Sequence, residues 1–279
     1  MDEVVGTFVG RWYVTALAAA FLVTAVRHMG WRRTGMYAVL SISLGVLAEN
    51  GSVHLGFPYT RYSFNPALRG DELFVGDVPL FVPLSYSFMG YFAFVAGRLL
   101  ASGPFRTRAR RPWTELLMAL VLAVWALWVL DPLVRLGRHF YLGEVFRYEG
   151  PGFWFGLPLG SQAGFTLTAV VLLALLYWLT GDEPARPAHG LLRHPHSLAL
   201  LIYHAQVFHL VVVAWTVGGR AANTLAAAAL LMWVPIAAMT AVHWSTLRLV
   251  DQSAAPADVA LGRAGDERAA PRATVSSRP

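Results

Sequence analysis

The stretch LLMALVLAVWALWVLD, Leu116–Asp131, places fifteen apolar residues in a row before a single aspartate. A helix that crosses the hydrocarbon core of a bilayer needs about 20 mostly apolar residues, so this run is short for a span. The rest of the chain has the same character: 56% of its 279 residues are hydrophobic, only 14% are charged, and the mean hydropathy is +0.51. An ordinary soluble domain is about 45–50% apolar. The composition therefore places the chain in a membrane.

Six other apolar segments accompany this one, so the sequence predicts an all-α fold, a polytopic membrane helical bundle of about seven transmembrane helices. The two short segments each end on a carboxylate, Glu49 or Asp131. After Trp244 the chain is rich in Ala, Pro, Arg, Asp and Ser, a composition that buries too little surface to order itself. We therefore expect a transmembrane catalytic domain over residues 1–245 and a disordered cytoplasmic tail over residues 246–279. The seven segments are Trp12–Met29, Met36–Glu49, Val78–Leu100, Leu116–Leu130, Gly164–Thr180, Ser197–Val217 and Ala222–Val242.

The basic residues indicate how the helices are oriented. All 22 are arginine, and the net charge is +6. They do not line one helix face with interleaved aromatic residues, which argues against a nucleic-acid partner. They gather after the first and third segments, and the positive-inside rule places both connections in the cytoplasm. We predict an integral protein of the cytoplasmic membrane with its amino terminus outside and its carboxyl terminus cytoplasmic. The arginines concerned are Arg27, Arg32, Arg33, Arg98, Arg106, Arg108, Arg110 and Arg111.

The residues that are missing exclude several kinds of chemistry. There is no cysteine and no lysine, so disulfides, thiolate metal sites, thiol catalysis and lysine Schiff bases cannot form. No phosphate loop, dinucleotide fingerprint, nucleophile elbow or zinc-protease motif occurs. His204 and His209 are five residues apart, on different faces of a helix, which suits metal binding poorly. The clustered aspartates that hold a magnesium diphosphate are also missing. We expect no cofactor, no metal and no diphosphate substrate.

Two long connections, residues 50–77 and 131–163, resemble each other. In both, a carboxylate ends a helix. Four features then follow in the same order: an Arg-Tyr pair, a Gly-rich stretch, a Pro-Leu pair and a Gly-aromatic pair. The Arg-Tyr pairs are Arg61-Tyr62 and Arg147-Tyr148. This order favours a parallel internal repeat, in which both units run from a helix through an outer loop to a returning helix.

The composition of these connections predicts a pocket near the outer surface. Gly- and Pro-rich backbone at membrane depth must be buried in protein or line a cavity, and ionisable groups there usually face the bundle interior. The alternative is that the polar residues lie among lipid headgroups or join the loops in ion pairs. Asp71, Glu72 and Asp77 are expected to be solvated loop residues. The catalytic candidates are Glu49, Asp131 and Glu149; the substrate-binding candidates are Tyr59, Arg61, Tyr62, Tyr86, Arg147, Tyr148, Trp154 and Gln162.

A pocket that combines aromatic faces with a carboxylic acid suits proton-initiated chemistry on a hydrocarbon. A buried carboxyl group can hold a proton and deliver it to an alkene. The ring faces then stabilise the carbocation through cation–π attraction. The aromatic residues are also consistent with a simple interfacial belt, since Trp and Tyr gather at membrane surfaces regardless of function.

Two stretches resemble the membrane carotenoid biosynthesis protein family, which includes the bacterioruberin-pathway hydratases of haloarchaea and actinobacteria. They are AENGSVHLGFPYTRYSFNPAL with VPLFVPLSYSFMGYF, and DPLVRLG with FRYEGPGFWFGLPLGSQAGF, and they cover about Glu49–Phe165. The resemblance implies an enzyme that adds water across the terminal double bond of a long isoprenoid without a redox cofactor. It also implies a hydrophobic isoprenoid or carotenoid substrate taken from the lipid bilayer. A carboxylic acid among Glu49 and Asp131 would protonate the alkene, and a polar group among Asp131, Glu149, Tyr62 and Gln162 would position water.

The sequence departs from the family pattern at two places. Leu84-Ser85-Tyr86 stands where a tryptophan is expected after Val-Pro-Leu. The stretch PLGSQAGF, Pro158–Phe165, stands where the pattern Pro-x-x-Asn-x-x-Gly-Trp is expected. If the altered pocket excludes water, an internal alkene captures the cation instead and the enzyme is a terpenoid or meroterpenoid cyclase. A non-catalytic carotenoid- or lipid-binding protein, or a transporter, is the remaining alternative. Few polar residues continue into the inner halves of the helices, which counts against transport.

Overall fold

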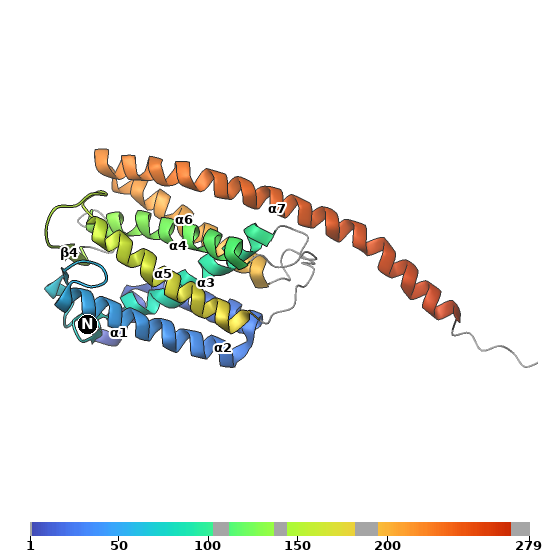
Figure 1. The fold of residues 1–279 in the computed structure, drawn as a ribbon, viewed down its shortest axis with the longest axis horizontal. Coiled ribbons are helices and arrows are strands. Elements are labelled where there is room, and N and C mark those ends of the chain that lie inside the picture. Colours follow the sequence, from blue (N-terminus) through green and yellow to red (C-terminus); the bar gives the residue numbers. More distant parts are fainter. Residues whose placement is uncertain (1, 103–111, 137–143, 182–194, 269–279) are drawn as a thin grey trace, which may run out of the picture.

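The computed structural model describes residues 2–102, 112–136, 144–181 and 195–268, which form a bundle of long helices packed side by side (Figure 1). Six helices within these residues are long and apolar enough to cross a membrane, so the predicted all-α membrane bundle is confirmed. The long helices are α2 (Trp12–Leu55), α3 (Phe81–Ser102), α4 (Pro112–Arg135), α5 (Leu159–Thr180), α6 (Pro195–Val217) and α7 (Gly219–Arg268).

Helix α2 consists of two arms that meet at Gly30. Gly30 has φ 79° and ψ 166°, which lie outside the helical region, and glycine adopts such a conformation without the penalty of a Cβ. Tyr13 and Glu49 line the same cavity, although a straight helix would separate them by about 54 Å at 1.5 Å per residue. The second arm therefore folds back beside the first. The two arms correspond to the first two predicted segments, Trp12–Met29 and Met36–Glu49.

Short strands cover one end of the bundle. Strand β1 (Tyr62–Phe64) pairs antiparallel with β4 (Phe146–Tyr148), and β2 (Phe74–Val75) pairs with β3 (Val78–Pro79). We call the end that carries β1 and β4 the strand end. In the β1–β4 register Tyr62 lies opposite Tyr148. The two Arg-Tyr pairs that the sequence predicts to be equivalent thus meet in one small sheet, while the repeat as a whole stays a prediction.

The amino-terminal segment is tied to the strand end. It comprises α1 (Glu3–Val5) and a π-helix, Gly6–Gly10. Arg11 then forms a buried ion pair with Glu72, with 2.6 Å between Nη2 and Oε1, and its guanidinium lies 4.5 Å from the ring centroid of Phe81. Burial raises the pKa of Glu72, and the charge of Arg11 opposes that rise. The expectation that Glu72 is a solvated loop residue is wrong, because the carboxylate supplies the partner that a buried guanidinium needs.

Helix α7 continues well past the bundle, as far as Arg268 (Figure 1). The sequence predicts disorder from residue 246, and the structure differs from that expectation over residues 246–268. Alanine has the highest helix propensity of all residues, and extending an existing helix avoids the cost of nucleation. Residues 269–279 of the predicted tail, and Arg106, Arg108, Arg110 and Arg111 of the predicted cytoplasmic connection, lie outside the described residues.

Candidate active site

A cavity of about 380 Å³ lies inside the bundle toward the strand end. Both arms of α2, together with α3, α4, α6 and the β1–β4 sheet, contribute to its walls. Two carboxylic acids, Glu49 from α2 and Asp131 from α4, face it. Its aromatic lining consists of Trp12, Tyr13, Tyr62, Phe64, Phe81, Tyr86, Phe88, Phe146, Tyr148 and Phe165.

Glu49 is held by two tyrosine hydroxyls. The Tyr62 hydroxyl contacts Oε2, and the Tyr86 hydroxyl contacts Oε1. Glu49 lies six residues before the end of α2, about 9 Å along the helix axis, and only 5% of its surface is exposed. Tyr62 reaches it from the sheet and Tyr86 from α3. The carboxyl group is therefore removed from solvent, and both of its oxygens have partners.

Tyr59 extends this contact into a longer hydrogen-bonded chain. Its hydroxyl lies 2.7 Å from the Tyr86 hydroxyl and 2.8 Å from Thr168 Oγ1 on α5. The ring stacks on Phe165 with 4.3 Å between centroids. A Cβ on Gly164 would approach the Tyr59 ring to 2.8 Å, so only glycine lets α5 come this close. Burial raises the pKa of the Tyr59 phenol above its ordinary value of about 10.

Asp131 is the second carboxylate of the cavity. Only 5% of its surface is exposed, and its Oδ2 is buried without a hydrogen-bond partner in the part of the chain that the structure describes. Burial raises the pKa of the nearby Tyr148 phenol, and the negative charge of Asp131 raises it further. Tyr148 therefore stays neutral. Asp131 keeps an oxygen available for a small polar molecule in the cavity.

The proline after Asp131 explains the position of Trp154. Pro132 lies inside α4 and has no N–H, so the carbonyl of Trp128, four residues earlier, lacks its usual helical donor. The indole Nε1 of Trp154 donates to that carbonyl at 2.9 Å. Trp154 thus completes the backbone hydrogen bonds of α4 and does not line the cavity.

Several other predicted site residues lie away from the cavity. The side chains of Arg61, Arg147 and Glu149 are exposed: Arg61 donates to the His54 carbonyl and Arg147 pairs with Glu144. Gln162 is buried, and within the described residues neither polar atom of its side chain has a hydrogen-bond partner. The cavity therefore brings together Glu49, Asp131, Tyr62, Tyr86 and Tyr148, with Tyr59 behind Tyr86.

Four polar side chains of the cavity were not among the predicted site residues, and one of them, Ser85, comes from α3. Tyr13 comes from the first arm of α2, and Gln206 and His209 come from α6. Gln206 and His209 are three residues apart, a spacing that places both on one face of a helix. Nothing in the sequence, however, indicates that α6 packs against α2. No arginine lines the cavity among the described residues. The same residues contain no group of three His, Cys, Asp or Glu that could hold a metal ion.

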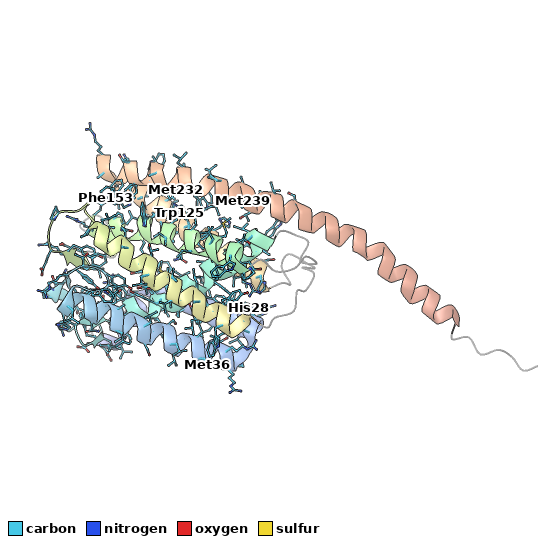
Figure 2. All side chains as sticks on the ribbon, viewed as in Figure 1. His28, Met36, Trp125, Phe153, Met232 and Met239 are labelled. Atoms are coloured by element: carbon cyan, nitrogen blue, oxygen red, sulfur yellow. The ribbon has the colours of Figure 1, made fainter. Side chains whose placement is uncertain are left out.

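The opposite end of the bundle carries a separate polar cluster. His28 lies there, far from Phe153 at the strand end (Figure 2), and its ring is 4.2 Å from that of His196. Arg98 and Glu115 form a buried ion pair with 3.3 Å between Nε and Oε2. These four side chains come from α2, α3, α4 and α6, so we assign the cluster to helix packing.

The fold and the cavity define a helical membrane protein with an acidic and aromatic site inside the bundle. The family model described as carotenoid biosynthesis protein matches residues 9–235 of the chain, and the chain belongs to this family. No match was found among the curated proteins or among the solved structures. The matched residues include every side chain that lines the cavity, and they support a role in carotenoid biosynthesis.

Proposed function

We propose that this protein is a carotenoid hydratase, a membrane enzyme that protonates a substrate C=C bond and adds water. The observation that carries the proposal is that two carboxylic acids from different helices face one aromatic cavity. The Glu49 carboxyl donates its proton to the less substituted carbon of the terminal C=C bond, and the π electrons form the new C–H bond. A tertiary cation remains on the neighbouring carbon. Water attacks that cation and gives up one proton to Asp131, which leaves a tertiary alcohol.

The arrangement of the cavity supports each of these steps. Aromatic rings face the position of the cation, where their π faces are attractive. Asp131 Oδ2 has no other described partner, so it can bind the attacking water and act as the general base. A proton then has to return from Asp131 to Glu49 before the next cycle. The overall reaction consumes one water and no net proton, so it needs no redox partner.

The cavity also shows how a membrane-dissolved substrate could reach the acid. Its volume of about 380 Å³ is near the lower limit of about 300–1,000 Å³ for small-molecule pockets, enough for the end of a carotenoid but not for the whole molecule. Trp12 and Ala16 of α2 and Ala205 and His209 of α6 line the cavity and are also exposed on the outside of the bundle. The cavity therefore opens sideways between two spans, and the rest of the chain would remain in the bilayer.

Narrowing this side opening is expected to slow the reaction. An Ala205→Trp substitution adds a ring at the mouth, and forcing a substrate past such bulk costs about 1–3 kcal/mol, or roughly tenfold or more in rate. The measurement is product formation from substrate in membranes. Ala174→Trp is the control, because Ala174 is exposed on α5 and does not line the cavity. Equal rates for the two variants would contradict entry between α2 and α6.

The proposed activity is tested by expressing the full chain in a lycopene-producing host and analysing the carotenoids by mass. A gain of the mass of one water per modified end supports the hydratase. An isomer of unchanged mass supports the alternative, a cyclase that uses the same acid but excludes water. The cyclase is retained because the cavity lining is mostly apolar. If neither product forms, lycopene-like substrates are excluded and a binding or transport role takes precedence.

A further inference from the structure

A chain of four polar contacts connects Glu49 to the backbone of α5. It runs from Glu49 Oε1 to the Tyr86 hydroxyl, then over 2.7 Å to the Tyr59 hydroxyl. It continues over 2.8 Å to Thr168 Oγ1 and over 3.0 Å to the Gly164 carbonyl. Each contact joins two oxygen atoms, so each needs one proton between them.

The number of protons along this hydrogen-bonded chain indicates whether Glu49 is protonated or ionised. The hydroxyls of Tyr86, Tyr59 and Thr168 supply three protons for four contacts, and the carbonyl at the end can only accept. If Glu49 is a carboxylate, one pair of buried oxygens faces each other without a proton, which is unfavourable in a site of low dielectric. If Glu49 carries a proton, it donates to Tyr86, Tyr86 donates to Tyr59, and Tyr59 donates to Thr168. All four contacts are then satisfied.

We propose that the Tyr86–Tyr59–Thr168 chain holds Glu49 as a neutral carboxylic acid, with its proton on Oε1 and its Oε2 accepting from Tyr62. Tyr59 and Thr168 do not line the cavity of about 380 Å³ that contains Glu49, so they are positioning residues and not catalytic ones. The catalytic meaning of this assignment rests on the proposed function. Within it, Glu49 is the proton donor and Asp131 is the base, a distinction that the sequence alone left open.

The surroundings of Glu49 are consistent with a neutral acid. The titratable groups that share its cavity come from α2, β1, α3, α4, β4 and α6: Tyr13, Tyr62, Tyr86, Asp131, Tyr148 and His209. None of them is an arginine, whose positive charge would stabilise a carboxylate. The hydrogen-bonded chain ends on the backbone carbonyl of Gly164, which cannot release a proton. The proton of Glu49 therefore leaves toward the cavity and not along the chain.

Infrared spectroscopy of the purified full chain tests the protonation state without any substrate. The difference spectrum between the wild type and Glu49→Gln at pH 7 should contain the C=O stretch of a protonated carboxylic acid, shifted in D₂O. Its disappearance on raising the pH measures when Glu49 ionises. A carboxylate band in place of the acid band would overturn the proposal.

Two tyrosine substitutions should move this transition in opposite directions. In Tyr59→Phe, Tyr86 loses its acceptor and becomes free to donate to the carboxylate, so the acid band should disappear about one pH unit lower, as expected for a hydrogen bond to a charged group. In Tyr62→Phe, the carboxylate loses a donor, and the band should persist about one pH unit higher. A purely structural role predicts shifts in the same direction or none. Tyr91→Phe is the control, because Tyr91 contacts His28 outside the cavity.

The same variants separate this inference from the proposed function. If the acid band shifts as described but no hydrated or cyclised product forms, the protonation assignment stands and the function is wrong. If product forms and its alkaline pH limit moves down in Tyr59→Phe and up in Tyr62→Phe, both stand. If product forms and the two variants share one pH limit, the hydrogen-bonded chain does not control the acid.

Discussion

A Glu49→Gln variant should lose product formation by about 10²–10⁴-fold or more, because general acid catalysis contributes a factor of this size and an alkene offers no other site for activation. Glutamine has nearly the same shape, so the Tyr62 and Tyr86 contacts and the packing of α2 should survive. The measurement is the amount of product per amount of membrane-inserted protein in the producing host. Of the two carboxylates in the cavity, Glu49 is the one in contact with a continuous set of hydroxyls.

The control for this variant is Glu144→Gln, which makes the same chemical change outside the cavity. Glu144 pairs with exposed Arg147 at the surface of the strand end, and such pairs contribute about 0–1 kcal/mol. Its product yield should match that of the wild type. If Glu49→Gln retains activity while the protein is inserted normally, Glu49 is not the acid.

An Asp131→Asn variant should change the product more than it slows the chemistry. The amide cannot take a proton from water, so hydration should fall by about 10²–10⁴-fold, the factor typical of a general base. Protonation by Glu49 continues, and the cation then loses a neighbouring proton to the Glu49 carboxylate that this step has formed, which gives an isomer of unchanged mass. Mass analysis of the carotenoids from the same host distinguishes this isomer from the hydrated product.

Asp77→Asn is the matched control for this experiment. Asp77 is half-exposed, pairs with Arg69 and His54, and does not line the cavity. Undiminished hydration by Asp131→Asn would show that another group, such as Gln206 or His209, activates the water. If Asp131→Asn forms no product at all while Glu49→Gln stays active, the two roles are reversed: Asp131 is the proton donor and Glu49 is the base.

Much of the site was predictable because it follows from local sequence. Glu49 and Asp131 each follow an apolar segment, and a charge at that depth has to face the interior. The Arg-Tyr pairs marked the two connections that meet in the β1–β4 sheet. The same reasoning overestimated Arg61, Arg147 and Glu149. Arg147 neighbours the buried Tyr148 in β4, so its side chain points to the opposite face of the strand. Arg61 and Glu149 flank β1 and β4 and are exposed as well. Trp154 was also misplaced, since the carbonyl it serves depends on Pro132 in another element.

The sequence by itself determined the membrane setting, the all-α fold, the two carboxylates and the absence of thiol and lysine chemistry. These properties follow from composition and from the length of the apolar runs, because both decide whether a segment is more stable in lipid or in water. Only the tertiary structure decided that Tyr62 and Tyr86 converge on one carboxyl group with Tyr59 behind Tyr86, and that α6 completes the cavity. It also decided that Asp131 keeps an oxygen without a partner among the described residues. Those contacts and the shared cavity bring together residues up to 198 positions apart, the separation of Trp12 and Leu210. Helix packing sets them, and hydrophobic patterns do not encode which faces meet.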